Sequence, residues 1–173
     1  LAAIKFKMKA PKGFTLVWTD KGSAQREPLS IWAPDVEGNK GVGALFQRKA
    51  RVNLSLGHYA VHGHEMPAKT VRVLEVADTA ATTPSHSEHL ESVVEQLLPK
   101  PVRFRLVWQE KSSSVKPFFL WRAVPPSAEF VALGCLATST DEPPSTDSIC
   151  CVPRRWMMAT PPPPRLVWRD EGQ

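Results

Sequence analysis

The triplet Leu-Val-Trp occurs three times in this chain, beginning at Leu16, Leu106 and Leu166, and a carboxylate follows each copy within two residues. The residues around the first two copies also align. The alignment pairs Trp32 with Trp121 and, further on, Gly57 with Gly134. Self-similarity of this kind indicates symmetry-related units that share one core. The repeat therefore constrains the fold before any other feature does.

Each unit has the pattern of a group of short strands. It consists of the triplet strand, a polar turn, a strand that ends in Trp, a Leu-Gly strand, an acidic-proline turn and a final strand. The chain has 17 prolines, and several of them form clusters beside runs of apolar residues. Proline removes a backbone donor and breaks helices, so short strands between turns are expected. We predict an all-β, β-prism-like fold with pseudo-threefold internal repeats.

The repeats and the segments between them give the domain organisation. One short helix is expected at about 85–98, where Leu90, Val93 and Leu97 share a face and Pro99 ends the pattern. A strand at residues 4–9 is expected to pair beside the last triplet and complete a third repeat, because an unpaired edge invites aggregation. The predicted single domain, 1–173, contains repeat 1 at about 13–77 with a loop insertion at 38–51, a helical linker at 78–102, repeat 2 at about 103–158 and a partial repeat 3 at about 160–173.

The tryptophans are predicted to be core residues rather than sugar-binding platforms. With strict alternation along a strand, Leu and Trp of the triplet lie on one face and Val lies on the other. Trp156, beside two arginines, is the indole for which interfacial exposure is expected. The predicted structural core comprises Trp18, Trp32, Gly57, Trp108, Trp121, Gly134 and Trp168.

Residues 118–152 carry a resemblance to a known family. The segment contains Trp121, then Leu133-Gly134-Cys135, then Glu142-Pro143-Pro144, and it ends in Cys151-Val152. This pattern resembles the repeated unit of the vacuolar-protein-sorting-associated sixty-two domain. Such units occur in plant and fungal proteins of that name and in chorein-type proteins that transport lipids at membrane contacts. The resemblance implies an all-β accessory module, without chemistry of its own, that helps a larger protein meet a membrane or a sorting partner.

The basic residues give the functional prediction. Lys5, Lys7 and Lys9 alternate with apolar residues, so on a strand they form one solvent-facing row. Arg48, Lys49 and Arg51 form a second basic group. Near an anionic leaflet each such charge contributes about 1 kcal/mol, which predicts weak, salt-sensitive docking. The alternative is equally open: lysines on an edge strand also discourage aggregation.

No residue pattern indicates catalysis. The chain lacks the Gly-x-Ser-x-Gly elbow of hydrolases and the glycine loop that binds phosphates, and its adjacent carboxylates point apart on a strand. His58, His62 and His64 form a weak metal candidate, whose spacing matches no known motif. Solvated turn histidines are the preferred interpretation. We therefore expect no enzyme activity, no cofactor and no metal.

The composition limits which partners and which cellular compartment are expected. The formal charge of +5 permits acidic partners, of which anionic lipids are preferred to nucleic acid. Three cysteines are an odd number and favour a reducing compartment. No apolar run approaches the length of a transmembrane segment. We expect a cytoplasmic chain, peripheral at endomembranes or within a large assembly, and a fragment of a longer protein because it begins without Met.

These observations predict a non-catalytic adaptor or membrane-docking module of a larger vacuolar sorting or lipid-transport protein. Its partners would be other domains, a protein complex or an anionic membrane surface. Two alternatives stay open at this stage. One is a structural subunit of a large ciliary or cytoskeletal assembly, and the other is a lectin-like, carbohydrate-binding β-prism.

Overall fold

The computed structural model describes residues 3–23, 27–36, 51–68, 71–80, 85–111, 116–159 and 166–169, with only the backbone at 85–88. Within these ranges the chain forms short strands and one α-helix. Short 3-10 turns lie at Thr146–Ser148 and Arg154–Trp156. The elements are β1 (Ile4–Lys9), β2 (Phe14–Thr19), β3 (Leu29–Pro34), β4 (Arg51–Leu54), β5 (Tyr59–His62), β6 (Val73–Asp78), α1 (Ser85–Leu97), β7 (Arg103–Glu110), β8 (Phe118–Val124), β9 (Phe130–Val131), β10 (Cys135–Thr138) and β11 (Val152–Pro153).

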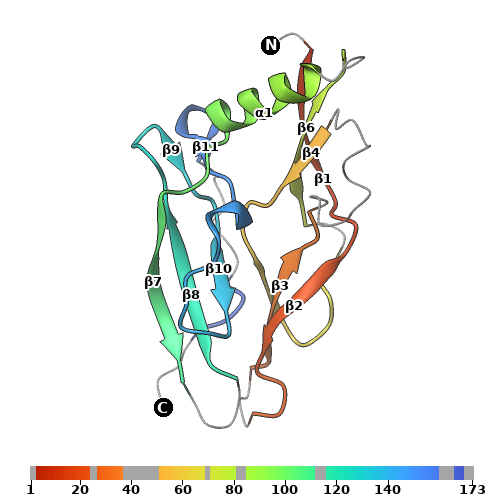
Figure 1. Cartoon of the computed structure of the whole chain (residues 1–173). Helices are drawn as coiled ribbons and strands as arrows, with labels where there is room; N and C mark the ends of the chain where they lie inside the picture. Colours follow the sequence, from red (N-terminus) through yellow and green to blue (C-terminus); the bar gives the residue numbers. More distant parts are fainter. Residues whose placement is uncertain are drawn as a thin grey trace.

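The described strands form three antiparallel sheets of three strands each and one strand pair. Their orders are β2-β3-β5, β10-β8-β7, β1-β6-β4 and β11-β9. Figure 1 shows the sheet of β7, β8 and β10 on one side of the molecule, and the other two sheets one above the other on the opposite side. Helix α1 crosses their upper end. The fold is thus mostly β and β-prism-like, and the predicted helix is present.

The two long copies of the repeat fold alike. In both, the triplet strand pairs with the strand that carries the next Trp, and that strand then pairs with the segment after the Leu-Gly step. The register between the first two strands shifts at the same place in each copy, between Leu16 and Trp18 and between Leu106 and Trp108. The shift marks a β-bulge at the central Val of each triplet.

This bulge makes the predicted side-chain alternation wrong. Leu16 lies opposite Trp32, whereas Trp18 lies opposite Ile31, the next residue back along β3. Adjacent residues of a strand point to opposite faces, so Leu16 and Trp18 also point to opposite faces. Leu16 is 46% exposed and Trp18 only 7%. The extra residue in the bulge is the physical reason.

The N-terminal strand also differs from its expected pairing. β1 runs antiparallel to β6, with Ile4 opposite Asp78 and Lys9 opposite Val73. The third triplet, within 166–169, has no strand. Four prolines precede it in the sequence, and proline offers no N–H to a ladder. The pairing of β1 with the last triplet is therefore corrected to a pairing with β6.

The third triplet nevertheless places its indole as the repeat predicts. Trp168 packs against Trp108, with ring centroids 5.9 Å apart. Phe118 contacts both Trp18 and Trp108, at centroid distances of 4.7 and 5.3 Å. One cluster thus contains the Trp of all three triplets. Trp18 and Trp121 are buried, while Trp108, Trp168 and Trp32 are partly buried.

A second cluster joins helix α1 to the sheet of β1, β6 and β4. Leu90, Val93 and Leu98 pack there with Val76 and Cys150. The apolar residues on the inward face of the helix recur at intervals of three and four residues, as predicted for an amphipathic helix. No helix in the described ranges is long and apolar enough to cross a bilayer.

The paired glycines of the two copies meet at the junction between the repeats. A Cβ placed on Gly134 would lie 2.6 Å from the carbonyl oxygen of Leu56 and 3.0 Å from the Cα of Gly57. Gly57 is buried and has φ of +137°, a conformation that L side chains rarely adopt. The backbones of the two copies therefore touch at a point where neither glycine can carry a side chain without movement.

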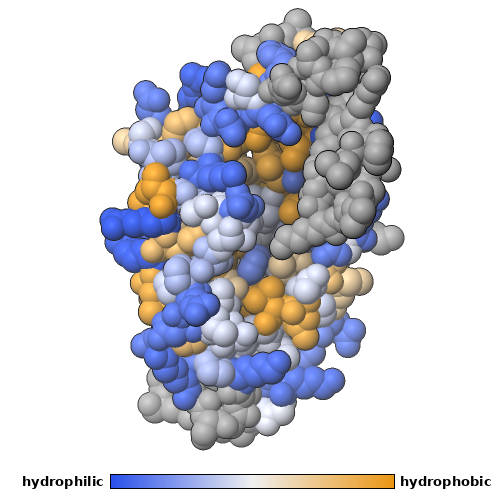
Figure 2. Space-filling model, in the orientation of Figure 1, coloured by the Kyte–Doolittle hydropathy of each residue, from blue (hydrophilic) through white to orange (hydrophobic). Residues whose placement is uncertain are grey.

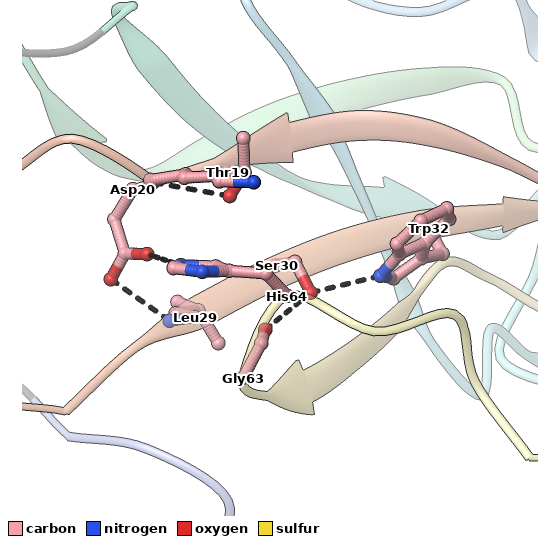
Figure 3. Close-up of polar contacts among 8 residues, drawn as sticks. Thr19, Asp20, Leu29, Ser30, Trp32, Gly63 and His64 are labelled. Carbon is pink, nitrogen blue, oxygen red and sulfur yellow. Dashed lines mark hydrogen bonds and ion pairs between the residues drawn. The ribbon is translucent and has the colours of Figure 1, made fainter.

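Asp20, the carboxylate after the first triplet, connects β2 to β3 and to the turn after β5 at one end of their sheet. Asp20 is buried; its side chain accepts the N–H of Leu29 at 2.8 Å and lies 2.6 Å from His64 Nε2. Nearby, Ser30 Oγ donates to the carbonyl of Gly63 and accepts from the indole N–H of Trp32. Figure 3 shows both groups of contacts linking β2, β3 and the turn after β5. Asp20 thus has a structural role in the first copy.

Candidate functional site

The lysines of β1 share one face of their sheet with residues of β6 and β4. In the antiparallel register Lys7 lies opposite Glu75, and Glu75 lies opposite Asn53. Residues opposite one another point to the same side. Because side chains alternate along a strand, Lys5, Lys9 and Arg51 point to that side too. We call this set, Lys5, Lys7, Lys9 and Arg51, the basic face.

Glu75 is the one carboxylate that the strands β1, β6 and β4 place on the basic face. Lys9 Nζ lies 2.9 Å from Glu75 Oε2, and Arg51 Nη1 lies 3.9 Å from the same atom. The hydrogen bond from Lys9 lowers the pKa of Glu75, and the charges of Lys9, Arg51 and Lys7 lower it further. Four cations and one carboxylate leave three positive charges on the face. Lys5, Lys7 and Arg51 are exposed, so they can reach an anionic surface.

The structure brings together four of the six predicted basic residues. Arg48 and Lys49 lie outside the described residues, as does the insertion from 38 to 50. Arg51 is the first residue of β4 rather than part of a loop. Arg51 lies opposite Ala77 of β6, and Lys5 of β1 lies opposite the same residue from the other side, so the two cations are one strand apart across β6.

An exposed apolar edge adjoins the same strand, and sequence reasoning missed it. Phe6 and Met8, which alternate with the lysines, are 38% and 48% exposed. Phe6 contacts Trp156 edge to face, at a centroid distance of 5.1 Å. We call the set of Phe6, Met8, Trp156, Met157 and Met158 the apolar edge. The sequence analysis predicted interfacial exposure for Trp156 and made no assignment for Phe6 and Met8.

A second basic surface lies on the sheet of β7, β8 and β10. Arg105 is directly opposite Arg122, and Arg103 is two residues earlier on the same side of β7. All three are exposed. Like charges placed opposite each other destabilise a sheet slightly. This surface, absent from the predicted sites, provides a matched control for the basic face.

The three predicted metal candidates do not converge. His58 Nδ1 accepts the N–H of Ala137, His64 pairs with Asp20, and His62 is exposed on β5. Within the described ranges no three His, Cys, Asp or Glu side chains are placed to hold a metal ion. His58 and His64 thus have structural partners in different parts of the fold.

We expect His58 to make stability depend on pH. Burial removes the ring from water and lowers its pKa from 6.5 to about 4. The ring also accepts the N–H of Ala137 at Nδ1, which a protonated Nδ1 could not do. Between these values the unfolded chain binds the proton and the native chain does not, so stability falls as pH drops from 6.5 to 4. The loss approaches about 3 kcal/mol. Urea titrations at several pH values measure it, and a His58→Asn variant, which keeps an acceptor near Nδ1, should show a flatter profile. An equal slope in the variant would contradict this.

A pocket of about 320 Å³ lies between α1, β4 and the segment that precedes β11. Its lining includes Leu54, Val94 and Cys150 and also an ion pair, in which Lys100 Nζ lies 2.5 Å from Asp147 Oδ1. Burial raises the pKa of the Cys150 thiol to about 12, so it is protonated near neutral pH and a poor nucleophile. In the upper part of the molecule, Figure 2 shows hydrophobic surface, coloured orange, next to hydrophilic surface, coloured blue. The pocket thus has apolar walls but no activated group.

Comparison with known proteins places the chain in a family. A family model described as vacuolar protein sorting-associated protein 62 matches residues 51–170. No curated protein matches the chain. Among solved structures, the chain is similar to the crystal structure of GNIP1Aa from Chromobacterium piscinae, with a TM-score of 0.54 and 21% identity over 88% of this chain. The match spans 24% of that longer chain, and the likeness shows the fold alone. Since the family model covers more than half of its residues, this chain belongs to the vacuolar protein sorting-associated protein 62 family.

Proposed function

We propose that this chain is a non-catalytic module that docks a larger protein on an anionic membrane surface, in a role related to vacuolar sorting. The observation that carries the proposal is the basic face, on which four cations surround one carboxylate. Glu75 holds Lys9 and faces Arg51, and the other two lysines are directed to solvent. The family membership supports the setting, since its description is that of a sorting-associated protein.

The expected strength of this contact is small. A lysine or arginine close to an anionic leaflet contributes about 1 kcal/mol, so three net charges supply about 3 kcal/mol. A free energy of about 4 kcal/mol corresponds to a dissociation constant of about 1 mM. The basic face alone therefore gives weak docking, which salt screens because exposed charges more than a Debye length away contribute little.

Reversal of two charges on the basic face tests the proposal. In the Lys5→Glu/Lys7→Glu variant, repulsion replaces attraction at two exposed positions, and we expect at least tenfold weaker binding to vesicles that contain phosphatidylserine. Sedimentation with phosphatidylcholine vesicles, with and without phosphatidylserine, measures the change over a series of salt concentrations. Neither lysine has a hydrogen bond that the fold needs, so circular dichroism should be unchanged.

The second basic surface supplies the control. An Arg103→Glu/Arg105→Glu variant changes the net charge by the same amount on a different sheet, and we expect it to keep most of the binding. If both variants lose binding equally, net charge rather than the basic face determines the contact. If the unaltered chain does not sediment with the anionic vesicles even at low salt, membrane docking is wrong, and the structural-subunit alternative gains support.

A further inference from the structure

The apolar edge is a group of hydrophobic side chains that are exposed to solvent. Its exposed fractions are 38% for Phe6, 48% for Met8, 42% for Trp156, 41% for Met157 and 87% for Met158. Scattered apolar residues on a surface need no explanation, but a group of five that includes two aromatic rings in contact indicates an interaction site.

The edge is composed of two segments that are far apart in the sequence. β1 supplies Phe6 and Met8 at the end of the sheet order β1-β6-β4, and the turn Arg154–Trp156 with the residues after it supplies the rest. Phe6 and Met8 point to the same side as Ile4, which is buried against the helix cluster. The inward face of β1 is thus covered at its start and exposed further along.

Cations lie beside the apolar edge. Arg155 is exposed, and Arg154 is held by a bond from its Nε to the carbonyl of Ala128 at 2.9 Å. Lys5 and Lys7 alternate with Phe6 and Met8 on β1, so they point to the opposite face of the sheet; because β1 is at the end of the sheet order, both sets lie along the same edge. Trp and other aromatic rings favour the headgroup region of a bilayer, where long basic side chains reach the phosphates. The arrangement therefore matches an anionic membrane interface in both polarity and charge.

We propose that the apolar edge inserts into the headgroup region of an anionic membrane that approaches along the edge strand β1, while Lys5 and Lys7, on the other face of the same strand, contact its phosphates. This inference rests on the proposed docking function and defines the orientation, with β1 and the turn Arg154–Trp156 toward the bilayer. It also adds affinity to the weak electrostatic docking. Burial of apolar surface is insensitive to screening by salt, so the edge supplies the part of the affinity that persists when salt is raised.

A bilayer fits these observations better than a protein partner. The apolar side chains are two aromatic rings and three methionines, which adapt to an irregular environment, and the exposed cations Arg154 and Arg155 belong to the same turn. A protein partner would need a complementary acidic and apolar surface. Such a partner is the competing outcome of the test below.

The test compares two methionines that differ in position. Met158→Ser removes the most exposed member of the apolar edge, and Met66→Ser makes the same change at a residue that is 58% exposed in the turn after β5. We expect Met158→Ser to weaken binding to phosphatidylserine vesicles at least fivefold at high salt, and Met66→Ser to leave it unchanged. Both side chains are well exposed, so both variants should fold.

Fluorescence gives a second readout. On binding, Trp156 should move to a less polar environment, shift its emission to the blue and become quenched by brominated lipid. Trp156→Phe keeps an aromatic ring against Phe6, and the difference between its spectra and those of the unaltered chain isolates the contribution of Trp156. Loss of most of the quenching in this variant supports insertion.

The outcomes separate the two proposals. If the Lys5→Glu/Lys7→Glu variant loses binding while Met158→Ser binds normally and Trp156 is not quenched, docking stands and insertion is wrong. If the unaltered chain binds no vesicle, both proposals fail. If Met158→Ser binds vesicles normally but no longer captures a protein that the unaltered chain captures, the edge contacts a protein and the inference is overturned.

Discussion

Gly134→Ala is expected to destabilise the native state by about 3 to 5 kcal/mol, enough to unfold much of the protein. The added Cβ would lie 2.6 Å from the carbonyl oxygen of Leu56 and 3.0 Å from the Cα of Gly57. Both atoms belong to backbone, so the two repeats must move apart. That movement strains the bond from His58 N–H to the Cys135 carbonyl, at 3.0 Å, and the bond from Ala137 N–H to His58 Nδ1. Urea unfolding followed by circular dichroism measures the change.

Two other glycines separate the possible causes of that effect. Gly13→Ala places a Cβ 2.6 Å from Asp35 Oδ2, the same distance, but this carboxylate belongs to an exposed side chain that can rotate away. Gly22→Ala meets no atom within 4 Å, although its φ of +97° disfavours alanine. Apart from the change in backbone entropy that any replacement of glycine brings, we expect each variant to lose about 1 kcal/mol or less in its free energy of unfolding. A Gly134→Ala variant as stable as Gly13→Ala would show that the repeat junction is not rigid.

The sequence predicted the relation between these glycines but not their contact. The alignment of the two copies pairs Gly57 with Gly134, which follows from self-similarity alone. Contact between them depends on where the pseudosymmetry axis passes, and no local pattern carries that information. Glycine inside a strand pattern often marks a site where another backbone approaches closely, but the pattern does not say which backbone that is.

The bulge shows a different limit of sequence reasoning. Strict alternation placed Leu16 and Trp18 on one face, and the extra residue at Val17 reversed the relation. A bulge leaves no mark in hydrophobicity, because Leu, Val and Trp are all good strand residues. The predicted burial of Trp18 is confirmed, although the alternation from which it was argued is wrong.

For the candidate site, alternation predicted the basic face and missed the apolar edge. Lys5 and Lys7 point to solvent as the period of two requires. The same alternation turns Phe6 and Met8 to the other side of β1, but it does not say whether that side is covered. In the structure the cluster around helix α1 includes Ile4 but neither Phe6 nor Met8. Coverage depends on the position and length of the helix relative to the sheet, which the strand pattern does not contain.

Trp18→Ala is expected to cost about 3 to 5 kcal/mol, comparable to the glycine variant. Its indole is 7% exposed, lies 4.7 Å from the ring of Phe118 and donates its N–H to the carbonyl of Lys116 at 2.8 Å. Truncation leaves a large cavity in the cluster that all three triplets share, and a carbonyl without its partner. Unfolding in urea should show an unchanged slope and a much lower midpoint.

The other two triplets allow the symmetry itself to be tested. Trp168 is partly buried against Trp108 but lies in a segment without a strand, so Trp168→Ala should cost about 1 to 2 kcal/mol. Trp156→Ala, at an exposed indole outside this cluster, should cost less than about 1 kcal/mol. The order Trp18, Trp168, Trp156 follows from burial in one common cluster. If Trp168→Ala were as harmless as Trp156→Ala, the third triplet would contribute no packing energy, and the core would depend on two repeats rather than three.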